Sequence, residues 1–392
     1  MTTQDLRKLK LSLSMITVAA SLAVASSTGN AADLTVSGMI DTGMRLYHSN
    51  DGVSGTTNRY EMADGLLDGN RLLFIGHEQL SAQTDLGFWL EASFTSDSGQ
   101  MKTSGTLFDR GCYMWVRNQT LGQLSAGRSG AVRAGATPLT FDITWNRINP
   151  FGTGWGELGN PVFLMPFYGF SMNNMIQYDT PKIGPFQGHV QYSFAVSNET
   201  GVVEGKSAAD RYSSVSLTYD SSLVNLVAMV DTINENSSQG PKNDMVSALF
   251  GGNINVGDSK IYAWGAWFKN ANNIIAMPDF SDYSLFEGLD QINGYSFGVG
   301  ARIPALGGNI NLYAVTLKAD YDDQVSEDVV SRIGSEVRRY SAGAGYTYPL
   351  SKRTTLYGAV GFYKDIVSLV NDGHEFNNPM SSQVIFGINH KF

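Results

Sequence analysis

The 392-residue sequence is short of charge, of proline and of cysteine, and each shortage excludes a class of protein. Its one cysteine, Cys112, allows neither an intrachain disulfide nor a cysteine-cluster metal site. Eleven prolines are too few for a collagen or a proline-rich linker, and 11% aromatic residues are too many for a disordered chain. Soluble proteins are about 25% charged, whereas this chain is 16% charged. The low charge indicates that much of its surface faces something other than water.

Long apolar runs are also missing beyond the N-terminus, which excludes a helical membrane protein, since a spanning helix needs about eighteen such residues. The N-terminus itself has a basic start (Arg7, Lys8, Lys10), an apolar stretch over residues 11–25 and small residues up to Ala32. We interpret residues 1–32 as a secretory signal peptide, cleaved after Ala31 or Ala32, because the apolar stretch is too short and serine-rich for an anchor.

The charge of the exported chain follows from that interpretation. Cleavage removes three basic residues and one acidic residue from totals of 27 and 36, which leaves residues 33–392 with a net charge of −11. An acidic exported chain is a poor candidate for binding nucleic acid.

What recurs along the mature chain is strict alternation of apolar with polar or small residues. Residues 34–41, 86–95, 214–219 and 295–303 all follow this period of two, which is typical of β-strands. Gly298 and Gly300, like Gly343 and Gly345, lie on the face opposite the aromatic residues. Small and polar residues on one face suit a water-filled lumen, while the apolar row faces lipid. Because every backbone group in lipid must be paired, such strands are expected to close into a barrel.

The connections between these segments alternate in length. Short links at residues 181–186, 220–223 and 349–353 alternate with long polar ones at 198–211, 232–244, 270–293 and 320–338. Outer-membrane barrels have short turns in the periplasm and long loops outside. About 360 residues, in strands of about ten with alternating turns and loops, give roughly sixteen strands. The prediction is an all-β fold, one transmembrane antiparallel β-barrel domain over residues 33–392.

Seven stretches resemble, in order, the landmarks of the Gram-negative general porins of the neisserial and β-proteobacterial type. They are LTVSGMIDTG at residues 34–43, NRLLF at 70–74, FDRGCY at 108–113, LGQLSAGR at 121–128, QYDTP at 177–181, YPLSKRTTLY at 348–357 and GINHKF at 387–392. Their order covers the mature chain from end to end, which makes the resemblance specific. It implies a homotrimer of sixteen-stranded barrels in the bacterial outer membrane, each with an aqueous pore for passive diffusion of small hydrophilic solutes and ions.

The resemblance also implies that the third external loop folds inward and narrows the pore. The matching segment, residues 129–174, is rich in proline and aromatic residues that would pack against an inner wall. Charges that face one another across a constriction decide which ions pass. The candidates are Arg45, Arg71, Glu91, Arg110 and Arg128 from the wall, with Arg133, Asp142, Arg147 and Glu157 from the loop.

Among the wall candidates, Arg71, Arg110 and Arg128 match arginines of the family landmarks, which suggests a basic strip opposite the loop and a slight preference for anions. Arg128 has the strand parity of Leu124 and Ala126, so it reaches the lumen only if its strand ends there. For each arginine the alternative is a solvated residue without influence on permeation.

We expect the C-terminal strand to carry a signal for assembly into the outer membrane. Phe386, Ile388 and the terminal Phe392 are similar to the signal that the outer-membrane assembly machinery recognises. The expected partners are therefore this machinery, outer-membrane lipid and lipopolysaccharide, other copies of the chain and the permeating solutes.

Two catalytic motifs match by chance. GYSFG at residues 294–298 fits a nucleophile elbow, but alternation continues straight through Ser296, whereas an elbow needs a sharp turn into a helix. GWGELG at 154–159 fits a dinucleotide fingerprint, but Asn160-Pro161 follows where a helix should begin. The five histidines lack zinc spacing, and the acidic stretch at 320–328 lacks the turn glycine of a calcium loop. We expect no enzyme activity, no cofactor and no metal site, beyond loose divalent bridging in that external loop.

Three alternatives remain open from the sequence. An outer-membrane enzyme barrel would need a catalytic constellation in its lumen, and a secreted β-sandwich adhesin would need neither the terminal Phe nor the inward loop. A solute-specific channel would keep the same barrel and line it with a binding track, in which Trp145 and Trp155 would stack on a sugar.

Overall fold

A computed structural model describes residues 33–50, 55–135, 137–151, 171–197, 203–235, 243–271, 292–321, 336–368 and 380–392. Within these ranges, no helix has both the length and the apolar character that a bilayer span requires. The strands are β1 (Asp33–Asn50), β2 (Thr56–Asp64), β3 (Arg71–Ser81), β4 (Thr84–Ser93), β5 (Gly111–Asn118), β6 (Gly122–Ser129), β7 (Met172–Asp179), β8 (Phe186–Ser193), β9 (Arg211–Asp220), β10 (Val224–Asn234), β11 (Met245–Val256), β12 (Ser259–Ala271), β13 (Ile292–Ala305), β14 (Gly308–Tyr321), β15 (Glu336–Pro349), β16 (Thr354–Ser368) and β17 (Met380–Lys391). Two short helices, α2 (Pro138–Phe141) and α3 (Trp145–Ile148), lie between β6 and β7.

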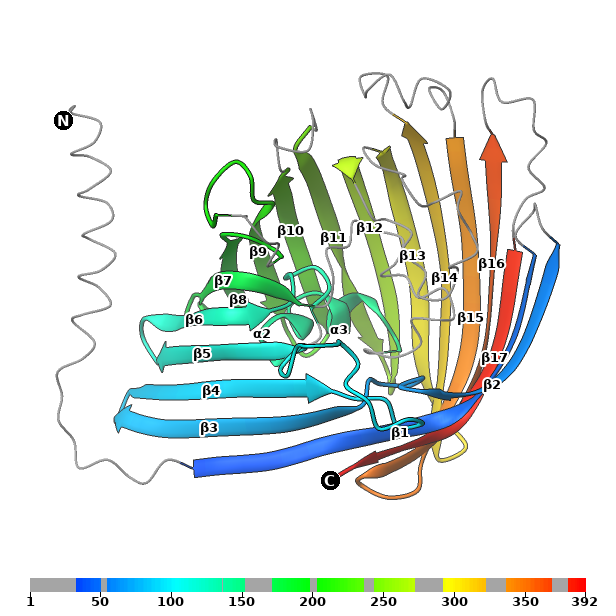
Figure 1. Cartoon of the computed structure of the whole chain (residues 1–392), viewed down its shortest axis with the longest axis horizontal. Coiled ribbons are helices and arrows are strands. Elements are labelled where there is room, and N and C mark those ends of the chain that lie inside the picture. The colour runs from blue at the N-terminus through cyan, green and yellow to red at the C-terminus, as the bar shows by residue number, and fades with distance from the viewer. Residues whose placement is uncertain are drawn as a thin grey trace.

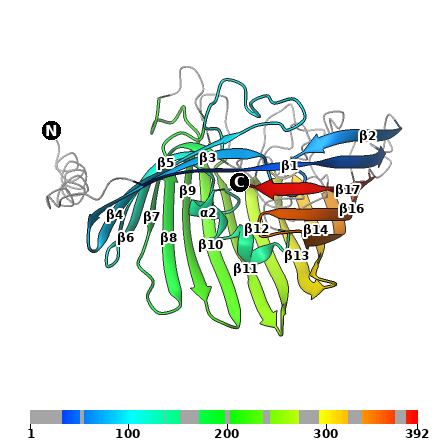
Figure 2. The ribbon, with the colours of Figure 1, turned by 90° about the horizontal axis from the view of Figure 1, so that it is seen from below.

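The strands form one antiparallel sheet that closes on itself where β1 pairs with β17 (Figures 1 and 2). One half of β1, from Thr42 to Asn50, pairs with β2, and the other half, from Asp33 to Met39, pairs with β3. β2 and β3 therefore share one position in the wall, and the strand segments fill sixteen positions. The prediction of a sixteen-stranded antiparallel barrel is confirmed.

The two faces of the wall differ as the alternation predicted. Outward-pointing Phe250, Phe297 and Phe386 are about half exposed, whereas inward-pointing Gln177 and Ser247 are buried. An apolar exterior around a polar interior is the pattern of a barrel in lipid. β13 also runs without a break through Ser296, so the elbow motif is not built there.

The inward glycines serve a purpose that the sequence did not indicate. A Cβ at Gly298 would meet the indole of Trp264 at 2.2 Å, and one at Gly343 would meet the ring of Tyr313 at 2.5 Å. Both rings point inward and are buried. These glycines make room for large side chains of neighbouring strands, so they do not form an open small-residue lining.

The connections divide the barrel into two ends. At one end, which we call the turn end, β13 and β14 are joined by Leu306 and Gly307 alone, both with positive φ (51° and 79°), the geometry of a tight hairpin. The strand ends that the long connections join lie at the opposite end, which we call the loop end. This alternation is the one predicted from the link lengths.

Candidate pore constriction

The chain between β6 and β7 turns into the barrel immediately after β6. The side-chain amide of Gln191, on β8, donates to the carbonyl of Gly130 (3.0 Å) and accepts from the backbone N–H of Val132 (3.1 Å). Gln177, on β7, donates to the carbonyl of Leu139 at 3.0 Å. Both glutamines are buried and point inward. They hold the start of the segment, which we call the inner segment (residues 130–135 and 137–151), against the inner wall.

Arg133 fastens the inner segment to β10. Its guanidinium donates to both carboxylate oxygens of Asp231, at 2.9 and 2.6 Å, and also to the hydroxyl of Ser247. Both charged side chains are only 2% exposed. Burial acts to lower the pKa of Arg133, but the charge of Asp231 and its hydrogen bonds outweigh it and raise that pKa, so the guanidinium stays charged. Arg133 is therefore an anchor of the segment.

The other end of the inner segment reaches further around the wall. Arg147 donates to both oxygens of Asp220 (2.7 and 2.9 Å), and Asn253, on β11, donates to the carbonyl of Arg147 at 2.9 Å. Phe151 packs edge-on against Tyr313 of β14, with ring centroids 5.2 Å apart. In Figure 1, α2 and α3 accordingly lie within the curve of the strands. The inner segment thus crosses the barrel along the β7–β14 side.

An opening of about 440 Å³ remains between the inner segment and the opposite wall. Pro138, Phe141, Asp142, Asn146 and Phe151 line it from the inner segment. Leu67, Asp68, Arg71, Leu73, Trp89, Glu91, Thr355, Asn389 and Lys391 line it from the wall. The lining carries charge of both signs, which is what a constriction that acts on ions requires.

The wall side of the opening is organised around Glu91. Its carboxylate is 1% exposed and accepts from Arg110 Nε (2.6 Å) and from Trp89 Nε1 (2.7 Å). Arg71 Nε lies 3.7 Å from the same carboxylate, and both Nη atoms of Arg71 bond to Asp68 at 2.9 Å. The side chains of Arg71 and Arg110 are 20% and 15% exposed, against 2% for Glu91, so both guanidinium groups are more accessible than the carboxylate with which they pair.

Asp41 holds the connection that carries Asp68. Its buried carboxylate accepts from the backbone N–H groups of Leu66 (3.1 Å) and Asp68 (3.2 Å), from Asn389 Nδ2 (2.9 Å) and from the Tyr357 hydroxyl (2.6 Å). The residues that connect β2 to β3 are thereby fixed against β1, β16 and β17. Asp41 therefore positions the charged groups of the opening.

Of the residues predicted to line the constriction, Arg71, Glu91, Arg110 and Asp142 lie at this opening or against it. Arg45 is buried and paired with Glu61 on β2, away from the opening. Arg147 binds Asp220, and Glu157 lies outside the described residues. Arg128 remains within β6, opposite Cys112 on the outer face, where it bonds to the carbonyl of Asp109 and to Asn173.

Other residues of the opening were missed from the sequence. Lys391 has the same strand parity as Asn389, which points inward, so parity could have identified Lys391 as a lining residue. Asp68 lies in the connection between β2 and β3, whose path no sequence pattern predicted. Asp142 is exposed on the inner segment and accepts from Asn146 at 3.0 Å.

Trp145 does not serve as a sugar platform. It is 1% exposed and packs against Ala134 and Phe141, with ring centroids 6.3 Å from the latter. The proposed stacking on Trp145 is wrong in this structure because the apolar indole fills the space behind the inner segment. Trp155 lies outside the described residues.

The C-terminal strand presents its predicted assembly residues outward. Phe386 and Ile388 are 49% and 40% exposed on the outer face of β17. Phe392 exchanges two backbone hydrogen bonds of 3.1 Å with Gly38, and its ring lies over that glycine. A side chain at position 38 would displace the ring.

A family model described as Gram-negative porin matches residues 12–365. An outer membrane porin protein of Bordetella pertussis is 25% identical over 387 residues, which cover 92% of this chain and 94% of the relative. Outer membrane porin protein 32 of Delftia acidovorans is 25% identical over 355 residues and 88% of each chain.

Solved structures show the same fold. An anion-selective porin from Comamonas acidovorans superposes with a TM-score of 0.64 at 21% identity, over 92% of this chain and all of that one. The outer membrane channel DcaP of Acinetobacter baumannii superposes with a TM-score of 0.58 at 14% identity, over 92% of this chain and 97% of that one.

Proposed function

This chain belongs to the Gram-negative porin family, and from that premise we propose where and how its channel discriminates among solutes. It is an outer-membrane channel for passive diffusion, as its family and fold establish. The narrow part of the channel, in our proposal, is the opening between the inner segment and the wall around Glu91. The observation that carries this proposal is that the inner segment is fastened by Arg133 and Arg147 and leaves an opening of about 440 Å³ with charged lining on both sides.

We further propose a slight preference for anions. The Glu91 side chain is only 2% exposed, whereas those of Arg71 and Arg110, which pair with it, are 20% and 15% exposed, so the guanidinium groups are the more accessible charges on that side. Lys391 adds a third cation, whereas Asp68 and Asp142 offset part of this charge. The near balance of charges favours weak selectivity, and a general channel over one with a dedicated track. The solved relative from Comamonas is described as anion-selective, which supports the same direction.

We also propose how the chain is exported and assembled. Residues 1–32 are removed as a signal peptide, and Phe386, Ile388 and Phe392 present the assembly signal to the outer-membrane machinery. The mature chain forms a homotrimer surrounded by outer-membrane lipid and lipopolysaccharide. A trimer form is described for OmpT of Vibrio cholerae, a protein with the same fold (TM-score 0.60, 12% identity).

Planar-bilayer recording of the purified protein tests the channel. We expect stepwise insertions with ohmic conductance, and a small reversal potential of the anion-selective sign under a salt gradient. Silent bilayers from correctly folded protein would contradict the open channel and favour a solute-specific barrel. A cation-selective reversal potential would contradict only the proposed preference for anions.

A further inference from the structure

One aromatic side chain of the inner wall lies at the opening itself. Trp89, on β4, lines the opening and is half-buried. Its Nε1 donates to Glu91 at 2.7 Å, and its ring stacks beside that of Tyr113, with centroids 6.3 Å apart and 12° between the planes. Gly111 leaves room for the indole, since a Cβ there would meet Trp89 Cδ1 at 3.1 Å. A ring that is fixed before a solute arrives loses little conformational entropy on binding.

The hydrogen bond to Glu91 also affects what the indole attracts. The face of an aromatic ring carries a partial negative charge. Donation of the indole N–H to a buried carboxylate increases that charge, because groups joined by a hydrogen bond polarise one another. The C–H bonds of a sugar ring direct a partial positive charge outward and are attracted to such a face. Trp89 therefore favours contact with a sugar ring over contact with another electron-rich aromatic ring.

A second aromatic ring lines the opening from the inner segment. Phe141 is half-buried, and the buried Trp145 stacks on it with ring centroids 6.3 Å apart. The exposed side chains of Asp142 and Asn146 line the opening beside it, and between them they offer hydrogen-bond acceptors and a donor. A sugar presents apolar C–H groups on the faces of its ring and hydroxyl groups around its rim. The opening offers partners for both.

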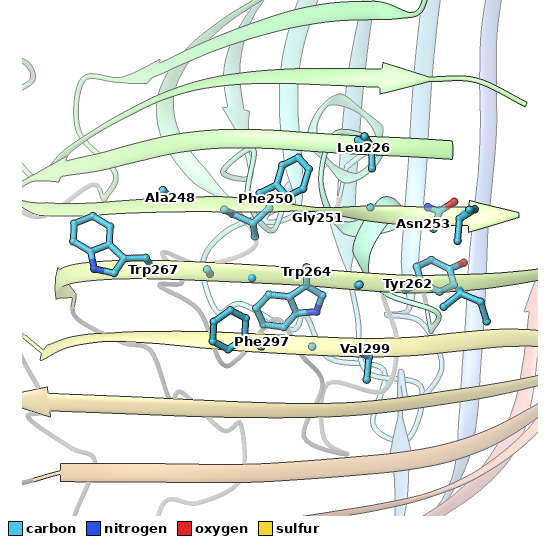
Figure 3. Close-up of a pocket in the computed structure, with 18 of the residues that line it drawn as sticks. Leu226, Ala248, Phe250, Gly251, Asn253, Tyr262, Trp264, Trp267, Phe297 and Val299 are labelled. Carbon is cyan, nitrogen blue, oxygen red and sulfur yellow. The ribbon is translucent and has the colours of Figure 1, made fainter. Parts of the chain in front are cut away.

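The aromatic residues around a larger apolar depression, of about 930 Å³ on β10 to β13, lie out of reach of permeating solutes. Phe250, Trp267 and Phe297 line this depression and are about half exposed on the outer face of the wall (Figure 3). Lipid covers that face in an outer-membrane barrel. Hydrophilic solutes in the lumen therefore meet Trp89 and Phe141 at the opening, and not this larger group of rings.

We propose that the opening is a binding subsite for cyclic sugars. A pyranose ring stacks on Trp89, contacts Phe141 on the side of the inner segment, and bonds through its hydroxyl groups to Asp142 and Asn146. The proposal rests on the proposed place of the narrow part of the channel and deepens it, since it names the class of solute that the opening retains. Its volume of about 440 Å³ is that of a small-molecule site, typically about 300–1,000 Å³. One stacking contact slows a sugar and lets other solutes pass, which agrees with a general channel.

Single-channel recording of the full protein with the disaccharide cellobiose tests the subsite. We expect cellobiose to interrupt the ion current of the parent, and a linear polyethylene glycol of similar mass, which has no ring, to interrupt it far less. Trp89→Leu should weaken the apparent affinity for cellobiose about fivefold, and Phe141→Leu about threefold, as expected for the loss of one aromatic contact. Trp115→Leu is the matched control, because the Trp115 indole also lies over a glycine of the inner wall, Gly87, but one inward pair nearer the turn end and outside the lining of the opening. Its affinity should stay within about twofold of the parent's.

A further variant separates stacking from the hydrogen bond to Glu91. Trp89→Phe keeps a ring and loses the indole N–H, so it should bind cellobiose more tightly than Trp89→Leu does. Equal affinity of these two variants, equal affinity of the parent and Trp89→Leu, or an equal loss in Trp115→Leu would overturn the proposal. Stronger interruption by benzoate than by cellobiose would overturn the assignment to sugars. A steady ohmic current that cellobiose leaves uninterrupted would overturn the sugar subsite alone, whereas silent bilayers would contradict the channel itself, so the two failures give different results.

Discussion

The hydroxyl of Tyr357 donates a 2.6 Å hydrogen bond to the carboxylate of Asp41, although 316 positions separate the two residues in sequence. The contact joins β16 to β1 across the seam where β17 closes the barrel. The same carboxylate also holds the backbone of Leu66 and Asp68. Closure of the barrel and placement of the charged opening therefore depend on one buried group.

The first prediction concerns this hydrogen bond. Tyr357→Phe removes one donor from a buried carboxylate and leaves the ring in place. We expect the free energy of unfolding to fall by about 1–3 kcal/mol, the usual cost of an unmet bond to a buried polar group. Urea unfolding of the protein in detergent measures it. Tyr348→Phe, at a ring that is 41% exposed, is the control and should change stability by less than about 0.5 kcal/mol. Equal stability of the parent and Tyr357→Phe would show that Asp41 does not need this donor.

The second prediction concerns the buried carboxylate of Glu91. Glu91→Gln keeps the shape of the side chain and removes the charge that faces Arg71 and Arg110. One unit of charge at about 7 Å in a watery lumen shifts the energies of a monovalent anion and a monovalent cation by roughly 0.6 kcal/mol each, in opposite directions, so the anion-to-cation permeability ratio should rise about sevenfold. The reversal potential in a salt gradient measures this ratio.

Arg71→Gln and Arg110→Gln should move the same ratio in the opposite direction. Asp85→Asn, at a carboxylate that pairs with Arg117 at the turn end, is the control and should leave the ratio unchanged. An unchanged reversal potential in all three test variants would place the narrow part of the channel elsewhere.

The strands and their two faces were predictable because alternation is a local property that the lipid and the lumen impose along the whole chain. Residues 295–303, for example, give the parity of β13 without any knowledge of its neighbours. The turn lengths then fix the antiparallel order. The interruption between β2 and β3 was not predictable, since it depends on contacts of Leu66 and Asp68 with Asp41.

The charged site was predictable only in part, because some of its contacts join residues that are distant in sequence. Residue type and parity identified Arg71, Glu91 and Arg110, whose partners lie on adjacent strands. Residue type alone placed Arg133 and Arg147 in the same predicted set, although their carboxylate partners lie 98 and 73 positions away in the chain. Ion pairs with the inner wall make these two arginines anchors of the inner segment, and no local sequence pattern predicts such pairs.

The third prediction compares two opposite charges at the opening. Asp142 lies on the inner segment and Lys391 on β17, and both line the opening. Asp142→Asn should raise the anion-to-cation permeability ratio, and Lys391→Gln should lower it by a similar factor of about two to three. The effects should shrink at high salt, because screening shortens the reach of each charge. Shifts of the same sign in both variants would show that the changes act through folding and not through charge.

The last prediction concerns the anchor of the inner segment. Arg133→Met leaves the Asp231 carboxylate buried without its counter-charge, and breaking such a pair costs about 3–5 kcal/mol. The inner segment also loses its attachment to β10, so single-channel records should show a larger and noisier conductance. Replacement of both partners, Arg133→Met with Asp231→Leu, removes the unpaired charge and should recover most of the stability, because apolar pairs of similar volume often substitute for a buried ion pair. Arg117→Met is the control, since the Arg117 side chain in its pair with Asp85 is 56% exposed, and a surface pair of this kind is worth about 1 kcal/mol or less. If Arg133→Met kept the conductance and stability of the parent, the segment would be held by its glutamine and Arg147 contacts alone, and the opening would not depend on this ion pair.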